Sequence, residues 1–270
     1  MTTDKDLIST AKDLRKKILY MSYCGGSSAA HLGGALSIVE ILSVLINKHI
    51  NLIPGNKNND HLILSKGHAC LAYYASLIKL GFIDEKEMET FEKDSSNLMG
   101  HPIKNLNYGI EFSTGSLGMG LSIANGLCLA NKKLKNNKKT FVIIGDGECG
   151  EGSIWEAALT ASHYKLNNLI VFLDKNGFQQ TGETKDILLN ENFFEKWKSF
   201  GWSVNEINGH SFEEIDGSIE NIASEKPNII ISNTTKGKGV SFAESNNTWH
   251  HSVLTKTNYE KALAELNEEY

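Results

Sequence analysis

Two short polar motifs, each placed directly after an apolar run, have residue types that could bind a metal ion and an anion. One apolar run, residues 141–144, leads into Gly145-Asp146-Gly147, and a second, residues 169–173, leads into Asp174-Lys175-Asn176. Both runs have the length and β-branched content of buried strands. Apolar residues at helical spacing lie between them, in residues 151–165, so this segment is predicted to fold as strand, helix, strand.

In a parallel unit of this kind, both strands end at the same edge of the sheet, where ligands bind in open α/β sheets. Asp146 and Asn176 are therefore expected to lie side by side at that edge. Carboxylate and amide oxygens are hard ligands that suit Mg²⁺ or Ca²⁺. The glycines on both sides of Asp146 leave room for a close phosphate. The two motifs together predict a cation that clamps a diphosphate.

Composition narrows the class of protein. The chain has 270 residues, 40% of them hydrophobic, which suits one large α/β domain. Its net charge of −5 gives no excess of positive charge that would indicate nucleic-acid binding. No apolar run approaches the ~20 residues needed to span a membrane, and the N-terminus lacks a signal-peptide profile. The four cysteines have no metal-site spacing, so we read them as reduced thiols. These features predict a cytoplasmic protein that binds neither nucleic acid nor a membrane.

The rest of the chain alternates between helical and extended patterns. Strands are predicted at residues 61–64, 141–144, 169–173, 203–207 and 228–232. Helices are predicted near residues 5–21, 36–49, 69–80, 85–92, 117–133, 153–165, 191–200, 212–223 and 259–270. Short strands separated by helices predict an α/β fold with an open, mostly parallel sheet that is covered by helices on both faces. The order of the strands cannot be read from this pattern.

The segment from Gly145 to Asn176 resembles the diphosphate- and metal-binding signature of thiamine diphosphate enzymes, and is most like that of the transketolase family. Other segments resemble further motifs of this family. Three resemble its histidine loops: residues 27–37 around His31, residues 60–68 ending at His68, and Met99-Gly100-His101-Pro102. Residues 113–120 resemble its glycine turn, and residues 234–239 and 249–251 resemble its last two motifs in this domain.

The resemblance implies a role for each matching residue. It implies catalytic roles for His31, His68, His101, His250 and Glu151. It implies cofactor contacts for Gly115, Ser116, Leu117, Gly145, Asp146, Gly147, Glu151, Asn176, His68 and His250, and metal ligation by Asp146, Asn176 and the backbone carbonyl of Phe178. Imidazoles of near-neutral pKa can stabilise an oxyanion and move protons while a ketose C–C bond breaks. His251 stands where the family usually has glycine and is left out of this set, and Asp174 is expected to orient its loop.

In the family, a glutamate from a second, pyrimidine-binding domain activates the cofactor. Residues 1–270 match the diphosphate-binding domain alone, so we expect the pyrimidine-binding and C-terminal domains on a separately encoded subunit. The resemblance then implies a heterotetramer in which Glu151 faces the activating glutamate across the interface. The expected activity is transfer of a two-carbon ketol unit from a ketose or ketose phosphate to an aldose, with thiamine diphosphate and Mg²⁺ or Ca²⁺.

Two other functions are compatible with the sequence. His31-Leu32-Gly33 faintly resembles 1-deoxyxylulose-phosphate synthases, which carry out a different carboligation with the same cofactor. A non-catalytic paralogue that binds a partner is the second alternative. The presence of Asp146, Asn176 and the four loop histidines argues against it. The upstream histidine loops also argue against the α-subunit of a 2-oxo acid dehydrogenase.

Overall fold

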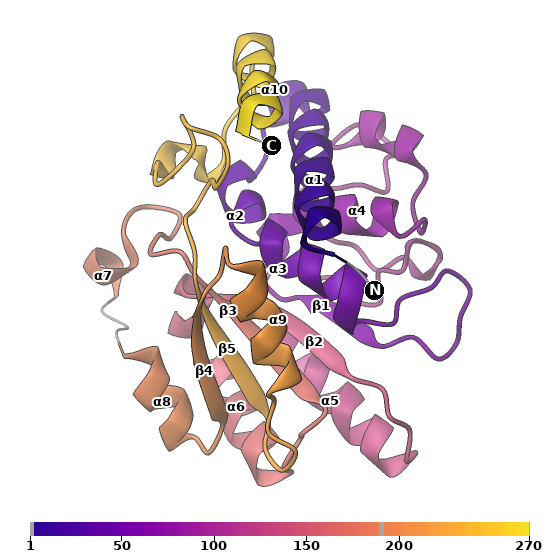
Figure 1. Ribbon diagram of the computed structural model, residues 1–270, viewed down its shortest axis with the longest axis vertical. Coiled ribbons are helices and arrows are strands. Elements are labelled where there is room, and N and C mark those ends of the chain that lie inside the picture. The colour runs from indigo at the N-terminus through magenta and orange to yellow at the C-terminus, as the bar shows by residue number, and fades with distance from the viewer. Residues whose placement is uncertain (1–2, 189–191, 270) are drawn as a thin grey trace. The chain divides into compact units, whose positions relative to one another are not determined.

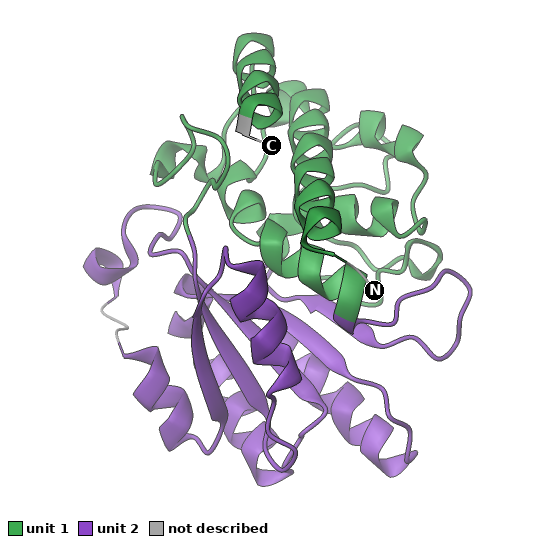
Figure 2. Cartoon of the chain, viewed as in Figure 1, with its two compact units in different colours: residues 1–48, 67–115, 235–270 green, residues 49–66, 116–234 purple. Residues whose placement is uncertain are grey.

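The computed structural model describes residues 3–188 and 192–269 (Figure 1). The chain forms two compact units (Figure 2). Unit 1 comprises Met1–Lys48, Gly67–Gly115 and Thr235–Tyr270, and unit 2 comprises His49–Lys66 and Ser116–Thr234. In the part of the chain that the structure describes, no helix combines the length and the hydropathy needed to cross a bilayer.

Unit 2 contains a five-stranded sheet in the order β1-β2-β3-β5-β4, and every neighbouring pair is parallel. Its strands are β1 (His61–Leu64), β2 (Thr140–Gly145), β3 (Leu169–Lys175), β4 (Ser203–Asn208) and β5 (Asn228–Asn233). The predicted positions and the parallel direction of all five strands are thus confirmed. The central strands β2 and β3 are buried, as their continuous apolar runs require.

Helices cover both faces of this sheet within unit 2. The helices of unit 2 are α5 (Gly120–Lys133), α6 (Gly152–His163), α7 (Thr184–Ile187), α8 (Phe193–Ser199) and α9 (Phe212–Glu220). Figure 1 shows α9 in front of the sheet and α5 and α6 behind it. The register pairs Gly145 with Asp174, so the loops that follow β2 and β3 begin at the same edge of the sheet.

Unit 1 is helical. It contains α1 (Asp4–Cys24), α2 (Leu32–Leu36), α3 (Val39–Val44), α4 (Cys70–Lys79) and α10 (Lys256–Glu269). A capping box starts α1: Thr3 accepts a hydrogen bond from the Asp6 N–H, and the Asp6 carboxylate accepts one from the Thr3 N–H. The apolar stripe of α1, which includes Leu7, Leu14 and Ile18, is fully buried, and α1 packs against α3, α4 and α10.

The predicted helices differ from the structure mainly where the backbone leaves helical geometry. The helix predicted at residues 36–49 is interrupted: α2 ends at Leu36, and Ile38, with φ −106° and ψ 11°, separates it from α3. A π-helical turn, Leu45–His49, follows α3. The helix predicted to start at residue 117 begins at Gly120, because Gly118 has a φ of +85°.

Three further predicted helices shift or change type. The helix predicted at residues 85–92 is a 3₁₀ helix, Glu85–Thr90. The helix predicted at residues 191–200 is α8, which begins at Phe193, and Glu191 lies outside the described residues. The C-terminal helix begins earlier than predicted, at Lys256, and the predicted end at Tyr270 also lies outside the described residues.

Candidate functional site

Asp146 lies at the end of β2 and ties the loop after β3 to the loop after β2. Its Oδ1 accepts a hydrogen bond from the Gly147 N–H at 2.8 Å. Its Oδ2 accepts from the Gly177 N–H at 2.8 Å and from the Thr184 hydroxyl at 3.2 Å. Burial, and next the negative charge of Asp174, raise the pKa of Asp146 to about 6. The carboxylate is therefore held in place by its donors even though burial disfavours its charge.

The side-chain amide of Asn176 has a fixed orientation. Its Nδ2 donates to the Asp174 carboxylate at 2.7 Å, and its Oδ1 accepts from the Phe178 N–H at 3.0 Å. Asp174 is fully buried and also accepts hydrogen bonds from Lys66 and Thr234. Since a carboxylate only accepts, the amide nitrogen must face Asp174, and the amide oxygen faces the other way. These contacts give Asp174 the loop-orienting position expected from the sequence.

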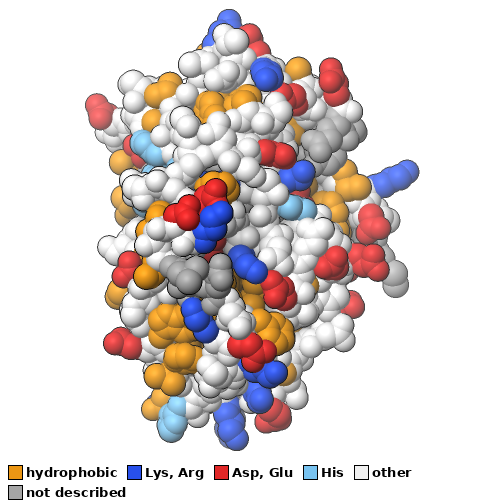
Figure 3. Space-filling view, turned by 90° about the vertical axis from the view of Figure 1, so that its left-hand side faces the viewer, with side chains coloured by type: hydrophobic (Ala, Val, Ile, Leu, Met, Phe, Trp, Pro, Cys, Tyr) orange, Lys and Arg blue, Asp and Glu red, His pale blue; other side chains and the backbone are white. Residues whose placement is uncertain are grey.

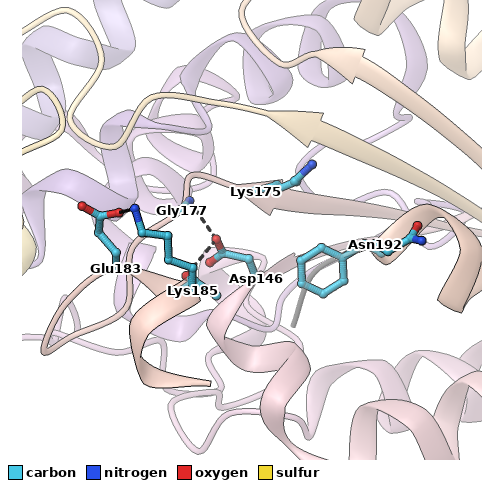
Figure 4. A pocket seen from close by; sticks show the side chains of 8 residues that line it. Asp146, Lys175, Gly177, Glu183, Lys185 and Asn192 are labelled. Carbon is cyan, nitrogen blue, oxygen red and sulfur yellow. Dashed lines mark hydrogen bonds and ion pairs between the residues drawn. The ribbon is translucent and has the colours of Figure 1, made fainter. Parts of the chain in front are cut away.

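A cavity of about 440 Å³ lies beside Asp146 in unit 2 (Figure 4). Gly177 and Thr184, the two partners of the Asp146 Oδ2, also line it. The lysines on its walls are paired with carboxylates: Lys175 with Glu206 at 2.9 Å, and Lys185 with Glu183 at 2.6 Å. Asp146 therefore lines this cavity, although it is only 3% exposed.

The donor set at this edge of the sheet suits a hard cation. Among the described residues, no group of three or more His, Cys, Asp or Glu side chains could hold a metal ion. The predicted ligands form a different kind of set, because they combine the Asp146 carboxylate with the Asn176 amide oxygen and the Phe178 carbonyl. The hydrogen bond from Gly177 to Asp146 brings the loop that carries the other two ligands to the carboxylate. Oxygen donors of these three types are common at Mg²⁺ and Ca²⁺ sites.

Glu148, to which sequence reasoning assigned no role, joins three segments of unit 2. Its carboxylate is buried and accepts hydrogen bonds from the Ser65 hydroxyl, from the Gly118 N–H at 2.8 Å and from the Gly145 N–H at 3.1 Å. Ser65 in turn accepts a hydrogen bond from the Gly120 N–H at 3.2 Å. One carboxylate thus connects the residue after β1, the glycine turn and the end of β2.

This network occupies two backbone N–H groups of the glycine turn. The N–H groups of Gly118 and Gly120 are directed to Glu148 and Ser65, so they are not available to an anion. Within the residues that the structure describes, no hydrogen-bond partner is recorded for the N–H groups of Ser116 and Leu117. Ser116 and Leu117 are predicted cofactor contacts, and their amides are among those of the turn that remain for a ligand.

Glu151 is the N-cap residue of α6 and is exposed. Its side chain does not cap the helix. Gly118 packs against it so closely that a Cβ on Gly118 would lie 2.8 Å from the Cβ of Glu151. The structure therefore brings Glu151 next to the glycine turn, with its carboxylate at the surface of the chain.

In unit 1, the structure brings together all four histidines that the sequence indicates as catalytic. The ring centroid of His31 lies 5.7 Å from that of His68, 5.4 Å from that of His101 and 5.3 Å from that of His250. The rings of His68 and His250 are 5.4 Å apart. His251, which was left out of the predicted set, belongs to the cluster too, with its ring 4.4 Å from that of His31.

Burial lowers the pKa of two histidines of the cluster, His31 and His101. Burial, followed by the positive charges of His251, His250 and His101, lowers the pKa of His31 to about 3. Burial is also the main reason that the pKa of His101 is lowered. His31 is therefore neutral at physiological pH and carries one N–H donor and one nitrogen acceptor.

Lys236, which sequence reasoning noted only as part of a motif, orients His250. Its Nζ contacts His250 Nδ1 at 3.0 Å and donates to Asn247 at 2.9 Å. An ammonium group only donates, so Nδ1 of His250 accepts and a neutral His250 carries its proton on Nε2. The buried Arg15 supports the same loop, because it donates to the Lys238 carbonyl at 3.0 Å and pairs with Glu40 at 2.6 Å.

The predicted cofactor contacts are divided between the two units. Those in unit 1 are His68, Gly115 and His250. Gly115 packs against the ring of His101. Those in unit 2 are Ser116, Leu117, Gly145, Asp146, Gly147, Glu151 and Asn176. Each unit thus assembles its own part of the predicted site.

Comparison with known proteins gives a consistent answer. The family model for the thiamine diphosphate binding domain of transketolase matches residues 9–267. The chain is 43% identical to one of the subunits of the apulose-4-phosphate transketolase of Actinobacillus succinogenes, over 98% of this chain and 97% of that protein. It is 39% identical to the 6-deoxy-6-sulfo-D-fructose transketolase subunit SqwG of a Clostridium species, also over 98% of this chain and 97% of that protein.

A solved structure gives the same result for the fold. The transketolase of Campylobacter jejuni superposes with a TM-score of 0.87 at 30% identity. The superposition covers 99% of this chain and 43% of that one, so this chain spans less than half the length of that transketolase. The family match over nearly the whole chain, the parallel sheet and the histidine cluster agree, and the chain belongs to the transketolase family, whose thiamine diphosphate-binding domain it contains.

Proposed function

We propose that this chain is the N-terminal subunit of a split, thiamine diphosphate-dependent transketolase. It would transfer a two-carbon ketol unit from a ketose donor to an aldose acceptor, together with a separately encoded C-terminal subunit. The observation that carries the proposal is the match, over 98% of this chain, to relatives that are themselves named as transketolase subunits and have nearly the same length. The assembled histidine cluster supports a catalytic chain rather than a scaffold.

In this proposal Asp146, Asn176 and the carbonyl of Phe178 would hold the metal ion. Ser116, Leu117, Gly145 and Gly147 would contact the diphosphate. The hard oxygen donors and the fixed orientation of the Asn176 amide support this assignment. Mg²⁺ is the expected cation because it is abundant in cells, and Ca²⁺ suits the same ligands. When bound, thiamine diphosphate supplies the nucleophilic carbon and the electron sink for breaking the ketose C–C bond.

In this proposal, the histidines transfer protons and stabilise negative charge on oxygen. The pKa of His31 is lowered to about 3, so this imidazole is neutral and a weak base, and its N–H can donate a hydrogen bond to a developing oxyanion. The hydrogen bond from Lys236 leaves the Nε2–H of a neutral His250 as a donor toward a developing oxyanion or a phosphate oxygen. His68 and His101 complete the set of imidazoles around His31.

The proposed partner carries the pyrimidine-binding domain, and residues 1–270 act as a single diphosphate-binding domain in a heterotetramer. The exposed carboxylate of Glu151 is available to meet a partner residue. Unit 2 also exposes large apolar side chains, among them Met119, Leu159 and Leu188. Figure 3 shows apolar groups between lysines and carboxylates on one face of the molecule. In this proposal these side chains provide apolar area that a partner subunit could bury.

The substrate class in this proposal is a sugar or a sugar phosphate. The two relatives carry the names of different sugars, apulose-4-phosphate and 6-deoxy-6-sulfo-D-fructose, so membership of this group leaves the sugar open. We also propose a cytoplasmic location. The free state of the four cysteines, Cys24, Cys70, Cys128 and Cys149, supports a reducing compartment.

A ketol-transfer assay tests the proposal. The chain is assayed with thiamine diphosphate and Mg²⁺, first alone and then mixed with the product of the neighbouring gene for a pyrimidine-binding half. We expect activity only in the mixture. Activity of the chain alone would contradict the need for a second subunit. Tight cofactor binding without ketol transfer would favour a different carboligation, and absence of both would favour a non-catalytic scaffold.

A further inference from the structure

His251 adds an exposed imidazole to a cluster whose other members are half-buried. Its ring lies 4.4 Å from that of His31, which is the shortest of the ring separations in the cluster. His31, His68, His101 and His250 are all half-buried, whereas His251 is exposed. Because the transketolase pattern usually has glycine at this position, this chain carries an imidazole beyond the predicted catalytic set.

The backbone holds His251 in this place. Ala30 and Ser252 form an antiparallel bridge in which each N–H donates to the other residue's carbonyl at 3.1 Å. His31 and His251 are the immediate neighbours of this pair, and His251 has extended geometry, with φ −144° and ψ 108°. Ser252 also donates from its hydroxyl to the Thr248 carbonyl at 2.6 Å. The proximity of the two rings is therefore set by paired backbone and not by the rotamer of His251 alone.

The imidazole of His251 is available to a ligand. Among the described residues, the structure records no hydrogen-bond partner for its ring nitrogens. An imidazole offers a donor and, when neutral, an acceptor, which matches the hydroxyl groups of a sugar. His250, by comparison, already uses its Nδ1 with Lys236.

We propose that His251 is a specificity-determining residue that contacts hydroxyl groups of the ketose beyond the two carbons that are transferred. This inference rests on the proposed transketolase function. The half-buried imidazoles of His31 and His101 lie deeper and suit the reacting end of the sugar. A ketose chain that leaves these two residues toward solvent passes the exposed ring of His251. A residue at this position can therefore change the choice of sugar without changing the reaction.

The test compares His251→Gly with the unaltered chain, each assembled with the partner subunit, thiamine diphosphate and Mg²⁺. Two donors are used: a ketose phosphate and 3-hydroxypyruvate, which presents the same hydroxymethyl ketone attached to a carboxylate instead of a polyol. We expect the KM for the ketose to rise about three- to tenfold, the effect of one lost hydrogen bond. The KM for 3-hydroxypyruvate, kcat and the affinity for thiamine diphosphate should stay the same.

Two further variants make the result specific. His251→Asn keeps a donor and an acceptor and should recover most of the affinity for the ketose. His163→Gly removes another exposed imidazole, at the last residue of α6, and should leave both donors unaffected. An unchanged KM for the ketose in His251→Gly, or an equal loss with both donors, would overturn the role of His251. Absence of ketol transfer in the unaltered assembly would overturn the proposed function, and this inference with it.

Discussion

The Nζ of Lys236 lies 3.0 Å from Nδ1 of His250, although the lysine is only 1% exposed. A buried ammonium group needs hydrogen-bond acceptors, and here one of them is an imidazole nitrogen of the candidate site. The pair therefore links the charge of a buried lysine to the tautomer of a histidine. This link makes Lys236 a positioning residue in the proposed reaction, and it can be tested directly.

Lys236→Met should lower kcat by roughly ten- to a hundredfold in the assembled enzyme, because His250 would no longer be held with its proton on Nε2. The measurement is steady-state ketol transfer, with thermal unfolding to confirm that the variant folds. Lys238→Met is a matched control, since Lys238 is partly exposed and pairs with Glu244 at 3.3 Å. If Lys236→Met keeps the kcat of the unaltered enzyme, the orientation of His250 does not depend on this lysine.

Glu148→Gln should weaken both the fold and cofactor binding. All three groups that contact this carboxylate are donors, so the new amide NH₂ would face at least one N–H or O–H donor. A buried donor left without an acceptor costs about 1–3 kcal/mol, and the glycine turn would lose its connection to β2. Urea unfolding and a thiamine diphosphate titration measure the two effects.

The control for this variant is Glu156→Gln, which changes an exposed carboxylate on α6. It should alter the free energy of unfolding by less than about 0.5 kcal/mol. A Glu148→Gln chain that matched this control in both stability and cofactor affinity would show that the network around Glu148 does not hold the turn.

Asp146→Ala tests the proposed metal site. The variant should lose metal-dependent retention of thiamine diphosphate, and it should also lose about 1–3 kcal/mol of stability because Gly147, Gly177 and Thr184 lose their acceptor. Equilibrium dialysis with and without Mg²⁺ measures the first effect, and urea unfolding measures the second. Full cofactor affinity in a folded Asp146→Ala chain would mean that the metal ligands have been assigned incorrectly.

The low pKa of His31 should make the fold sensitive to acid. This pKa is about 3 in the folded chain, below the ordinary value of 6.5. Between these two pH values the unfolded chain binds a proton that the folded chain does not, so the free energy of unfolding decreases as the pH falls. His31→Asn removes this contribution and should lose less stability than the unaltered chain between pH 6.5 and 4.

Urea unfolding at several pH values measures the effect, and His163→Asn, at an exposed position of α6, serves as the comparison. Parallel stability curves for His31→Asn and the unaltered chain would contradict the lowered pKa of His31. Because the effect concerns the chain itself, it can be measured without the partner subunit or the cofactor.

The sheet could be predicted from sequence because its signals are local. Residues 61–64 were predicted as a strand and form β1 with the same bounds, and the apolar runs before Asp146 and Asp174 form β2 and β3. The polar residues that end these runs mark the strand ends directly. Parallel pairing follows because helices separate most of the strands.

Other features depend on contacts between distant parts of the chain. A glutamate directly after Gly-Asp-Gly looks like a surface residue, and only the folded chain brings Ser65 and Gly118 to Glu148. Lys236 likewise appears in the sequence as one of many lysines. The break at Ile38 interrupts an otherwise helical pattern through its backbone angles, which no proline or glycine at that position signals.

Asp174 has a consequence for the energetics of ligand binding. Its buried carboxylate joins Lys66, which follows β1, and Thr234, which follows β5, to its own strand β3. Three strand ends are thereby ordered when the sheet folds. These segments therefore lose their conformational entropy when the chain folds and not when a ligand binds. Their ordering does not reduce the affinity for the ligand. A chain organised in this way can accept changes in its sugar-facing loops while the edge that is proposed to hold the cofactor keeps its shape.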